Sequence, residues 1–124
     1  MKLQNSLFTI VQHRQQEGVH SFDIHLNAGH VIYQAHFPGE PVTPGVCILQ
    51  VAVELIEEVV AMPLSLVGAK NVKFLRIISP VEVPEVCYSV QKVVVESDTV
   101  SAQIIVSAAD GIYAKLSLTC QKAA

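Results

Sequence analysis

Apolar and polar residues alternate through most of the second half of the chain. Five segments there are rich in Val, Ile, Tyr and Phe, and proline, serine, aspartate or glycine separates them. Such residues favour strands, and the Asp110-Gly111 pair between the last two segments is typical of a tight hairpin. The pattern therefore predicts antiparallel strands in residues 64–68, 72–78, 86–95, 100–108 and 112–120.

The first half of the chain mixes several patterns. In Val19–Leu26 every second residue from Phe22 onward is apolar, which predicts a half-buried strand. Residues 3–13 carry a loose helical spacing of apolar positions, but they fit the beginning of a strand equally well. Residues 30–35 are amphipathic over a short stretch, so we expect one or two helical turns there.

The longest apolar segment predicts a buried helix. Thr43 can cap a helix with its hydroxyl. Pro44 suits the first helical position because an N–H at that position has no hydrogen-bond partner within the helix. From Val46 to about Ala61, just before Pro63, the sequence is apolar nearly all round, so other structure must enclose the helix. One buried helix with several antiparallel strands predicts an α+β domain in which the sheet wraps the helix.

The composition fits one folded domain over residues 1–124. Hydrophobic residues make up 51% of the chain and charged residues 15%, which excludes a disordered chain. This balance also suggests apolar surface buried against a partner, most simply a second copy of the chain. No apolar run approaches the roughly 20 residues of a membrane span, and residues 1–16 lack the apolar core of a secretory signal. We therefore expect a cytoplasmic protein.

Charge and ligand spacing exclude other classes of protein. The net charge is -3 and the eight lysines and arginines are scattered, which disfavours nucleic-acid binding. Cys47, Cys87 and Cys120 form no CxxC pair and are odd in number, which favours reduced thiols and offers no zinc site. The five histidines lack the spacing with a carboxylate that metal hydrolases use, so we expect no metal.

The stretch from residue 36 to residue 50, HFPGEPVTPGVCILQ, carries the candidate chemistry. A helix N-terminus presents backbone N–H groups without partners, so the amides of Gly45 and Val46 can hold a developing oxyanion, and glycine leaves room for it. His36 can move a proton near neutral pH. Together these groups suit removal of a proton next to a carbonyl, with the helix terminus stabilising the enolate. The alternative is a core histidine in a loop that glycine and proline merely turn.

The motif His36-Phe37-Pro38-Gly39-x-Pro41-x-x-Pro44-Gly45, followed by an apolar helix, resembles the 3-hydroxyacyl-(acyl carrier protein) dehydratases of fatty acid synthesis. The likeness continues at residues 71–76 and Pro80, and it covers roughly residues 20–95. This resemblance implies the hotdog fold, in which a long antiparallel sheet wraps a central helix. It also implies that a 3-hydroxyacyl thioester loses water to give a trans-2-enoyl product, without a metal or an organic cofactor. The family implies a homodimer in which the histidine of one subunit faces the helix of the other.

One position departs from the family. A Glu or Asp stands fourteen residues after the histidine in the family, and that place is Gln50 here, whose amide can donate a hydrogen bond but not a proton. Glu54 lies one helical turn further along the same face, so we hypothesise that it reaches the substrate hydroxyl directly or through a water held by Gln50. The alternative places Glu54 with Glu57 and Glu58 in a solvated stripe. A further option is that His36 alone returns the proton to the departing oxygen.

Other residues have both a functional and a structural interpretation. Cys47, in the first turn of the helix, is either a thiol of lowered pKa or a packed side chain. His25 and His30 either line the pocket mouth or are ordinary polar residues. The candidate walls of an acyl pocket, which equally fit plain core packing, are Phe22, Ile32, Tyr33, Phe37 and Phe74. The candidate contacts to an acidic carrier protein, which equally fit ordinary surface cations, are Lys70, Lys73 and Arg76.

Three functions fit these residues. The first is a lyase, a 3-hydroxyacyl thioester dehydratase in fatty acid or aryl-polyene-type lipid synthesis. The second is a hotdog thioesterase, and the third is a noncatalytic acyl-binding or heterodimer partner, which Gln50 suggests. The sequence does not determine the acyl chain length. It also leaves open whether the thioester carrier is an acyl carrier protein or coenzyme A, and whether the protein is a homodimer or a trimer of dimers.

Overall fold

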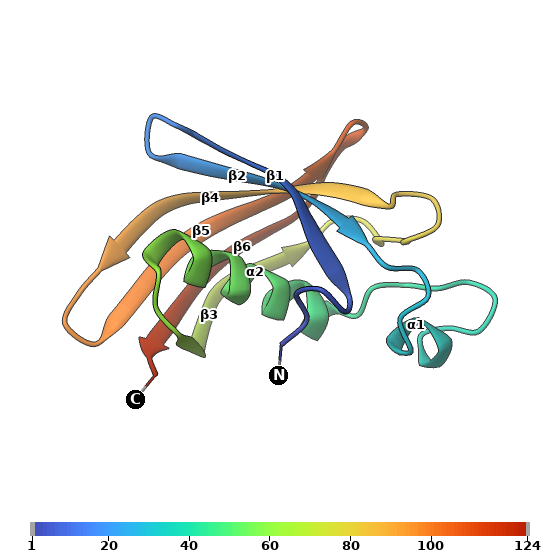
Figure 1. The fold of residues 1–124 in the computed structure, drawn as a ribbon, viewed down its shortest axis with the longest axis horizontal. Coiled ribbons are helices and arrows are strands. Elements are labelled where there is room, and N and C mark those ends of the chain that lie inside the picture. Colours follow the sequence, from blue (N-terminus) through green and yellow to red (C-terminus); the bar gives the residue numbers. More distant parts are fainter. Residues whose placement is uncertain (1, 124) are drawn as a thin grey trace.

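Both ends of the chain contribute strands to one antiparallel sheet. The computed structural model describes residues 2–123 and orders the strands β1-β2-β4-β5-β6-β3. Figure 1 shows the sheet as a curved layer with the long helix α2 lying against one of its faces. The strands are β1 (Phe8–Gln16), β2 (Val19–Leu26), β3 (Leu64–Phe74), β4 (Glu85–Val95), β5 (Thr99–Ala108) and β6 (Gly111–Lys122), and the helices are α1 (Ile32–Ala35) and α2 (Gly45–Val60).

Helix α2 is the buried core helix that its apolar sequence predicts. Half of its residues are buried, from Cys47 to Ile56, and the facing sheet residues Ile24, Val90 and Val106 are fully buried. Each such aliphatic side chain contributes about 1.5–3 kcal/mol when it leaves water, so the helix and sheet hold one another in place. The helix ends at Val60. The C-cap residue Ala61 donates its N–H to the Glu57 carbonyl at 2.8 Å, and its left-handed conformation (φ 56°) turns the chain out of the helix.

The start of α2 differs from the predicted cap. Pro44 is the N-cap residue and Gly45 the first helical residue, so the helix begins one residue later than expected. The Thr43 side chain makes no cap. Its hydroxyl is buried and bonds the Tyr33 hydroxyl at 2.9 Å. A buried hydroxyl needs a partner, and Tyr33 provides one that the local sequence could not reveal.

The predicted strands 64–68 and 72–78 are wrong as separate elements. They form one strand, β3, which runs from Leu64 to Phe74 and pairs with β6 throughout, with register shifts between Leu66 and Gly68 and between Ala69 and Asn71. Bulges of this kind absorb extra residues without ending the pairing. Residues 75–78 lie outside the strand.

The remaining predicted elements are confirmed or resolved. The strand predicted at Val19–Leu26 has those bounds. Of the one or two helical turns expected within residues 30–35, the structure has one, α1. Residues 3–13 take the strand alternative, because β1 begins at Phe8. The β4, β5 and β6 strands match the segments predicted from 86, 100 and 112 onward within a few residues.

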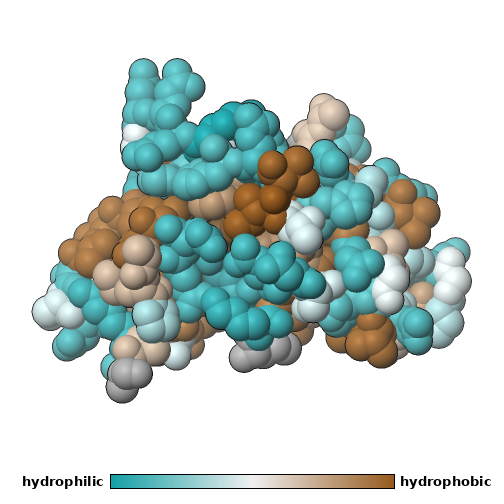
Figure 2. Space-filling view, in the orientation of Figure 1, coloured by the Kyte–Doolittle hydropathy of each residue, from teal (hydrophilic) through white to brown (hydrophobic). Residues whose placement is uncertain are grey.

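Apolar side chains remain exposed along the edge strand β3 and just beyond it. Leu66, Val67, Phe74, Leu75 and Ile77 are between 38% and 69% exposed. On the face seen in Figure 2 the area over α2 is mostly hydrophilic, and hydrophobic atoms gather at the end of the molecule where β4 ends. An unpaired sheet edge beside apolar side chains is a surface suited to another chain. No helix in residues 2–123 is long and apolar enough to cross a bilayer.

Candidate active site

His36 stands at the end of α1, on a loop that folds back on itself. Its carbonyl accepts the Val42 N–H at 2.6 Å, and Phe37 and Glu40 exchange two backbone hydrogen bonds inside the loop. Gly39 has a positive φ of 83°, which a residue with a side chain adopts only at a cost. The loop is thus closed by its own backbone, while the His36 side chain is exposed and its ring lies 5.7 Å from that of Phe37.

The path from the loop to α2 is fixed at Thr43. Its N–H bonds the Ile78 carbonyl at 2.9 Å, and its hydroxyl bonds Tyr33. Burial raises the pKa of the Tyr33 hydroxyl, so this group stays protonated and can donate. The residues after β3 and the single turn α1 therefore hold the N-terminus of α2 in position.

The first turn of α2 presents two backbone donors. The Pro44 carbonyl accepts the N–H groups of Cys47 and Ile48, at 3.0 and 3.1 Å. Within residues 2–123 no residue accepts a hydrogen bond from the amides of Gly45 and Val46. These two N–H groups sit at the positive end of the helix dipole, so they can bind an oxyanion.

A groove of about 290 Å³ opens beside these donors. A side chain at Gly45 would bring its Cβ within 3.0 Å of the Phe74 ring, so glycine is what allows that ring to lie against the helix start. The groove is mainly apolar, as an acyl chain requires. It is lined by Val42, Thr43, Gly45, Ile48, Phe74, Leu75, Arg76, Ile77 and Ile78. His36 is not among these residues, so a single chain does not bring the imidazole into the groove.

Gln50 and Glu54 form a hydrogen-bonded pair on α2. Glu54 is 1% exposed, so the solvated alternative is wrong for this residue. Its Oε2 accepts the Gln50 Nε2–H at 2.9 Å and the Leu3 N–H at 2.7 Å, and its Oε1 accepts the Gln4 N–H at 2.8 Å. Its burial and these three hydrogen bonds oppose a direct approach of Glu54 to a substrate hydroxyl.

The solvated interpretation also fails for Glu57 but holds for Glu58. The Glu57 side chain is 14% exposed, accepts the Leu64 N–H at 2.8 Å and pairs with Lys2 at 3.0 Å. The hydrogen bond from Lys2 Nζ to Glu57 is the main cause that raises the pKa of the Lys2 ammonium. Glu58 is exposed, as a solvated helix end predicts.

Cys47 is a packed side chain and not an activated thiol. The residue is buried, and burial raises the pKa of its thiol, which opposes the lowering that a helix N-terminus can cause. The hypothesis of a reactive thiolate is therefore wrong.

The five candidate acyl-pocket residues do not gather in one place. Only Phe74 lines the groove described above. Phe22 is buried in β2 and stacks on the His13 ring at 4.1 Å, and Tyr33 is buried beside Thr43. Ile32 is half-buried, and Phe37 is 58% exposed on the His36 loop.

The two further histidines occupy ordinary positions. His25 is exposed on β2, with its Nδ1 3.9 Å from a Glu85 carboxylate oxygen. The His30 Nδ1 accepts the Ile32 N–H at 3.1 Å and so supports the start of α1. Within residues 2–123, no three His, Cys, Asp or Glu side chains come together as a metal site.

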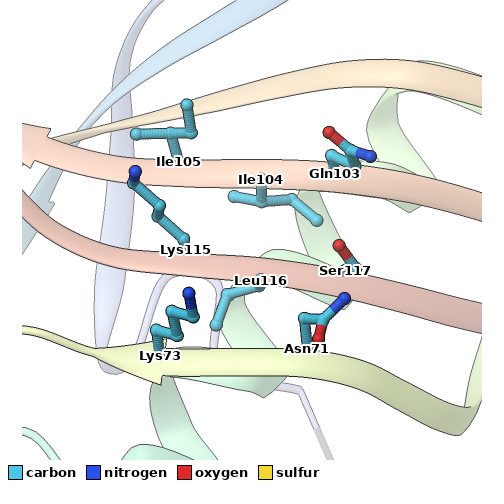
Figure 3. A pocket seen from close by; sticks show the side chains of 8 residues that line it. All are labelled: Asn71, Lys73, Gln103, Ile104, Ile105, Lys115, Leu116 and Ser117. Atoms are coloured by element: carbon cyan, nitrogen blue, oxygen red, sulfur yellow. The ribbon is translucent and has the colours of Figure 1, made fainter.

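The candidate carrier-binding cations have different surroundings. Lys73 pairs in register with Lys115 on the neighbouring strand, and the two line a shallow pocket of about 430 Å³. Figure 3 shows both side chains on the same face of the sheet. Arg76 pairs with Asp110 at 3.0 Å and lies over the Tyr113 ring, whereas Lys70 is exposed on β3.

Comparisons with known proteins bear on both fold and family. A family model described as ApeI-like, ApeI dehydratase, matches residues 12–110. The dehydratase heterocomplex ApeI:P from Xenorhabdus doucetiae contains a chain with a TM-score of 0.64 at 15% identity, covering 91% of this chain and 96% of that one.

Thioesterase structures are equally similar. A hypothetical thioesterase with coenzyme A from Streptococcus pneumoniae TIGR4 has a TM-score of 0.64 at 11% identity, covering 94% of this chain and 85% of that one. Thioesterase HI1161 from Haemophilus influenzae has a TM-score of 0.63 at 14% identity, covering 94% of this chain and 78% of that one. No curated protein matches the sequence. The α+β hotdog fold is thereby confirmed, and the shared fold alone does not choose between the two activities.

Proposed function

Because the chain belongs to the ApeI-like dehydratase family, we propose that it removes water from a 3-hydroxyacyl thioester and gives a trans-2-enoyl product. The observation that carries the proposal is the pair of backbone amides at Gly45 and Val46, which have no acceptor within residues 2–123. Gly45 also lines the apolar groove beside them. The thioester carbonyl oxygen binds these amides, and the acyl chain extends along the groove.

In the proposed reaction His36 is the base. It removes a proton from C2 of the substrate, and the electron pair moves into the carbonyl, whose oxygen becomes negative and is held by the amides of Gly45 and Val46. When the C2–C3 double bond forms, the bond from C3 to the hydroxyl breaks. Since the amide of Gln50 cannot give up a proton, His36 returns its proton to the departing hydroxide, and Gln50 hydrogen-bonds that oxygen.

The proposed site needs two chains. His36 is exposed and lies outside the groove of its own chain, and β3 leaves an unpaired edge with apolar side chains beside it. We propose a homodimer that pairs the two sheets and brings the His36 of one chain to the α2 N-terminus of the other, alone or within a trimer of dimers. The oligomeric state is testable by light scattering.

The thioester carrier is an acyl carrier protein or coenzyme A. Lys70, Lys73 and Arg76 are the cations proposed to contact an acidic carrier, and Arg76 also lines the groove. The pathway proposed is fatty acid or aryl-polyene-type lipid synthesis in the cytoplasm.

Two other functions have an observation in their favour. Thioesterases match this fold as closely as a dehydratase does, and they need the same oxyanion site. A noncatalytic partner is favoured by Gln50, which stands where the resembling dehydratases carry a carboxylate. In that case the chain holds an acyl group or completes an active heterodimer.

One experiment separates these three functions. The purified protein is incubated with 3-hydroxyacyl thioesters of graded chain length, on acyl carrier protein and on coenzyme A, and the products are followed by mass spectrometry. We expect loss of one water with the thioester intact, and none in the His36→Gln variant. Release of free thiol without loss of water would identify a thioesterase. Tight binding without any turnover would identify a noncatalytic partner.

A further inference from the structure

Glu54 is a buried carboxylate surrounded by N–H donors. Its side chain, 1% exposed, accepts three hydrogen bonds, two from the backbone of the N-terminal segment and one from the side chain of Gln50. A carboxylate removed from water needs such donors, because an unpaired buried charge is strongly unfavourable. The arrangement therefore explains how Glu54 is tolerated in the core, and it ties the N-terminal segment to helix α2.

The hydrogen bond to Glu54 fixes which end of the Gln50 amide faces it. The two ends of a glutamine amide have nearly the same shape, but one only donates and the other only accepts. Because the Leu3 and Gln4 amides already donate to the Glu54 carboxylate, that group acts as an acceptor, and the Gln50 atom 2.9 Å away is Nε2. Rotation of the amide by half a turn would place two oxygens against each other.

Gln50 lies at the place where this orientation matters. It is one helical turn beyond Val46, whose backbone amide is one of the two proposed oxyanion donors, and one turn before Glu54. Residues four apart on a helix are neighbours on one face. Gln50 therefore lies between Val46 and Glu54 on one face of the helix.

The segment that holds Glu54 is itself anchored. Leu3 and Leu7 are 5% and 0% exposed, and the Asn27 side chain donates to the Ser6 carbonyl at 2.9 Å. Asn27 also donates its backbone N–H to the Leu7 carbonyl at 2.7 Å. The amides that bind Glu54 therefore belong to a packed part of the fold.

We propose that Glu54 is a positioning residue: the Leu3 and Gln4 amides hold its carboxylate, and the carboxylate holds the Gln50 amide in one orientation for the reaction. This inference rests on the proposed dehydratase function. It assigns the N-terminal segment a role in the active site, and it removes Glu54 from direct contact with the substrate.

Replacement of Glu54 by glutamine tests the orientation. An amide at position 54 can accept from Gln50 or donate to it, so both orientations of Gln50 become available. We expect the Glu54→Gln variant to lose about 10- to 100-fold in kcat with KM changed less than about twofold, because binding is kept and alignment is lost. Activity is measured at a temperature at which circular dichroism shows the variant to be folded.

A backbone change tests the same chain of contacts without touching α2. The Gln4→Pro variant removes the N–H that donates to Glu54 Oε1, whereas Gln4→Ala keeps it. We expect kcat to fall in Gln4→Pro and to stay within about twofold of the wild type in Gln4→Ala. Lys2→Ala, which breaks the ion pair to Glu57 and keeps the Leu3 and Gln4 amides that bind Glu54, is the second control.

The orientation has a readout that does not depend on turnover. In nitrogen-edited NMR spectra the two Gln50 side-chain N–H signals should be well separated and protected in the wild type, and should merge with those of exposed amides in Glu54→Gln and Gln4→Pro. Equal Gln50 signals in the wild type and Glu54→Gln would overturn the inference. So would unchanged kcat in a folded Glu54→Gln enzyme. If the wild type turns over no thioester, the proposed function fails, and the NMR comparison alone decides the orientation.

Discussion

The Glu54→Gln substitution also gives a stability prediction that the structure makes quantitative. The substitution keeps the size and shape of the side chain and changes one acceptor oxygen into a donor NH₂ group. Glu54 meets three N–H groups at 2.7 to 2.9 Å, and none of the three can accept a hydrogen bond. Whichever way the new amide turns, its NH₂ group faces an N–H donor at a side chain that is only 1% exposed.

The expected loss follows from that mismatch. One hydrogen bond is removed and one buried donor is left without a partner, which costs about 1–3 kcal/mol. For a domain of this length, about 2 kcal/mol corresponds to a decrease in Tm of about 8 °C. Glu58, on the same helix but exposed, provides the control: Glu58→Gln should change the free energy of unfolding by less than about 0.5 kcal/mol.

The assay is urea and thermal unfolding followed by circular dichroism. All variants are compared at one protein concentration, because association shifts apparent stability. If Glu54→Gln unfolds at the same urea concentration as Glu58→Gln, the carboxylate is not held by buried donors and the argument for its role is wrong.

Three other results are expected. Gly45→Ala should abolish turnover at little cost in stability, since the new methyl meets the half-exposed Phe74 ring at 3.0 Å beside the oxyanion site; an active variant would contradict this. Gln50→Glu should change the dependence of kcat on pH, because a titratable group then replaces an amide; an identical pH profile would place Gln50 outside the site. Burial, followed by the charge of His13, lowers the pKa of His20. Stability from neutral His20 should be present above about pH 6.5 and be lost as the pH falls through the lowered pKa, and a His20→Gln variant should not show this loss in urea titrations.

The sequence predicts the elements whose pattern is local. In the strand Val19–Leu26 apolar and polar side chains alternate, because one face of the strand is buried and the other is not. Helix α2 is apolar nearly all round because the sheet encloses it. Both were therefore found with almost the right bounds. The motif from His36 to Gly45 likewise led to the fold, since its glycine and proline spacing is specific.

What the sequence could not reveal depends on distant contacts. Strand β3 continues through Gly68 and Ala69 because β6 pairs with it. The residues of β3 alone carry no sign of this pairing. Glu54 looked like a member of a solvated stripe or a catalytic acid, but its partners are backbone amides some fifty residues away. Backbone donors carry no side-chain signature, so these partners had no signal in the sequence.

The central claim is that His36 removes a proton from C2 of an acyl thioester bound at the helix N-terminus. The most direct test is solvent deuterium incorporation at C2 of a 3-hydroxyacyl thioester in D₂O, measured by mass spectrometry of the recovered substrate and product. We expect deuterium at C2 with the wild-type protein and none with His36→Gln. Exchange that persists in His36→Gln, or its absence in a wild-type protein that releases free thiol, would contradict the account.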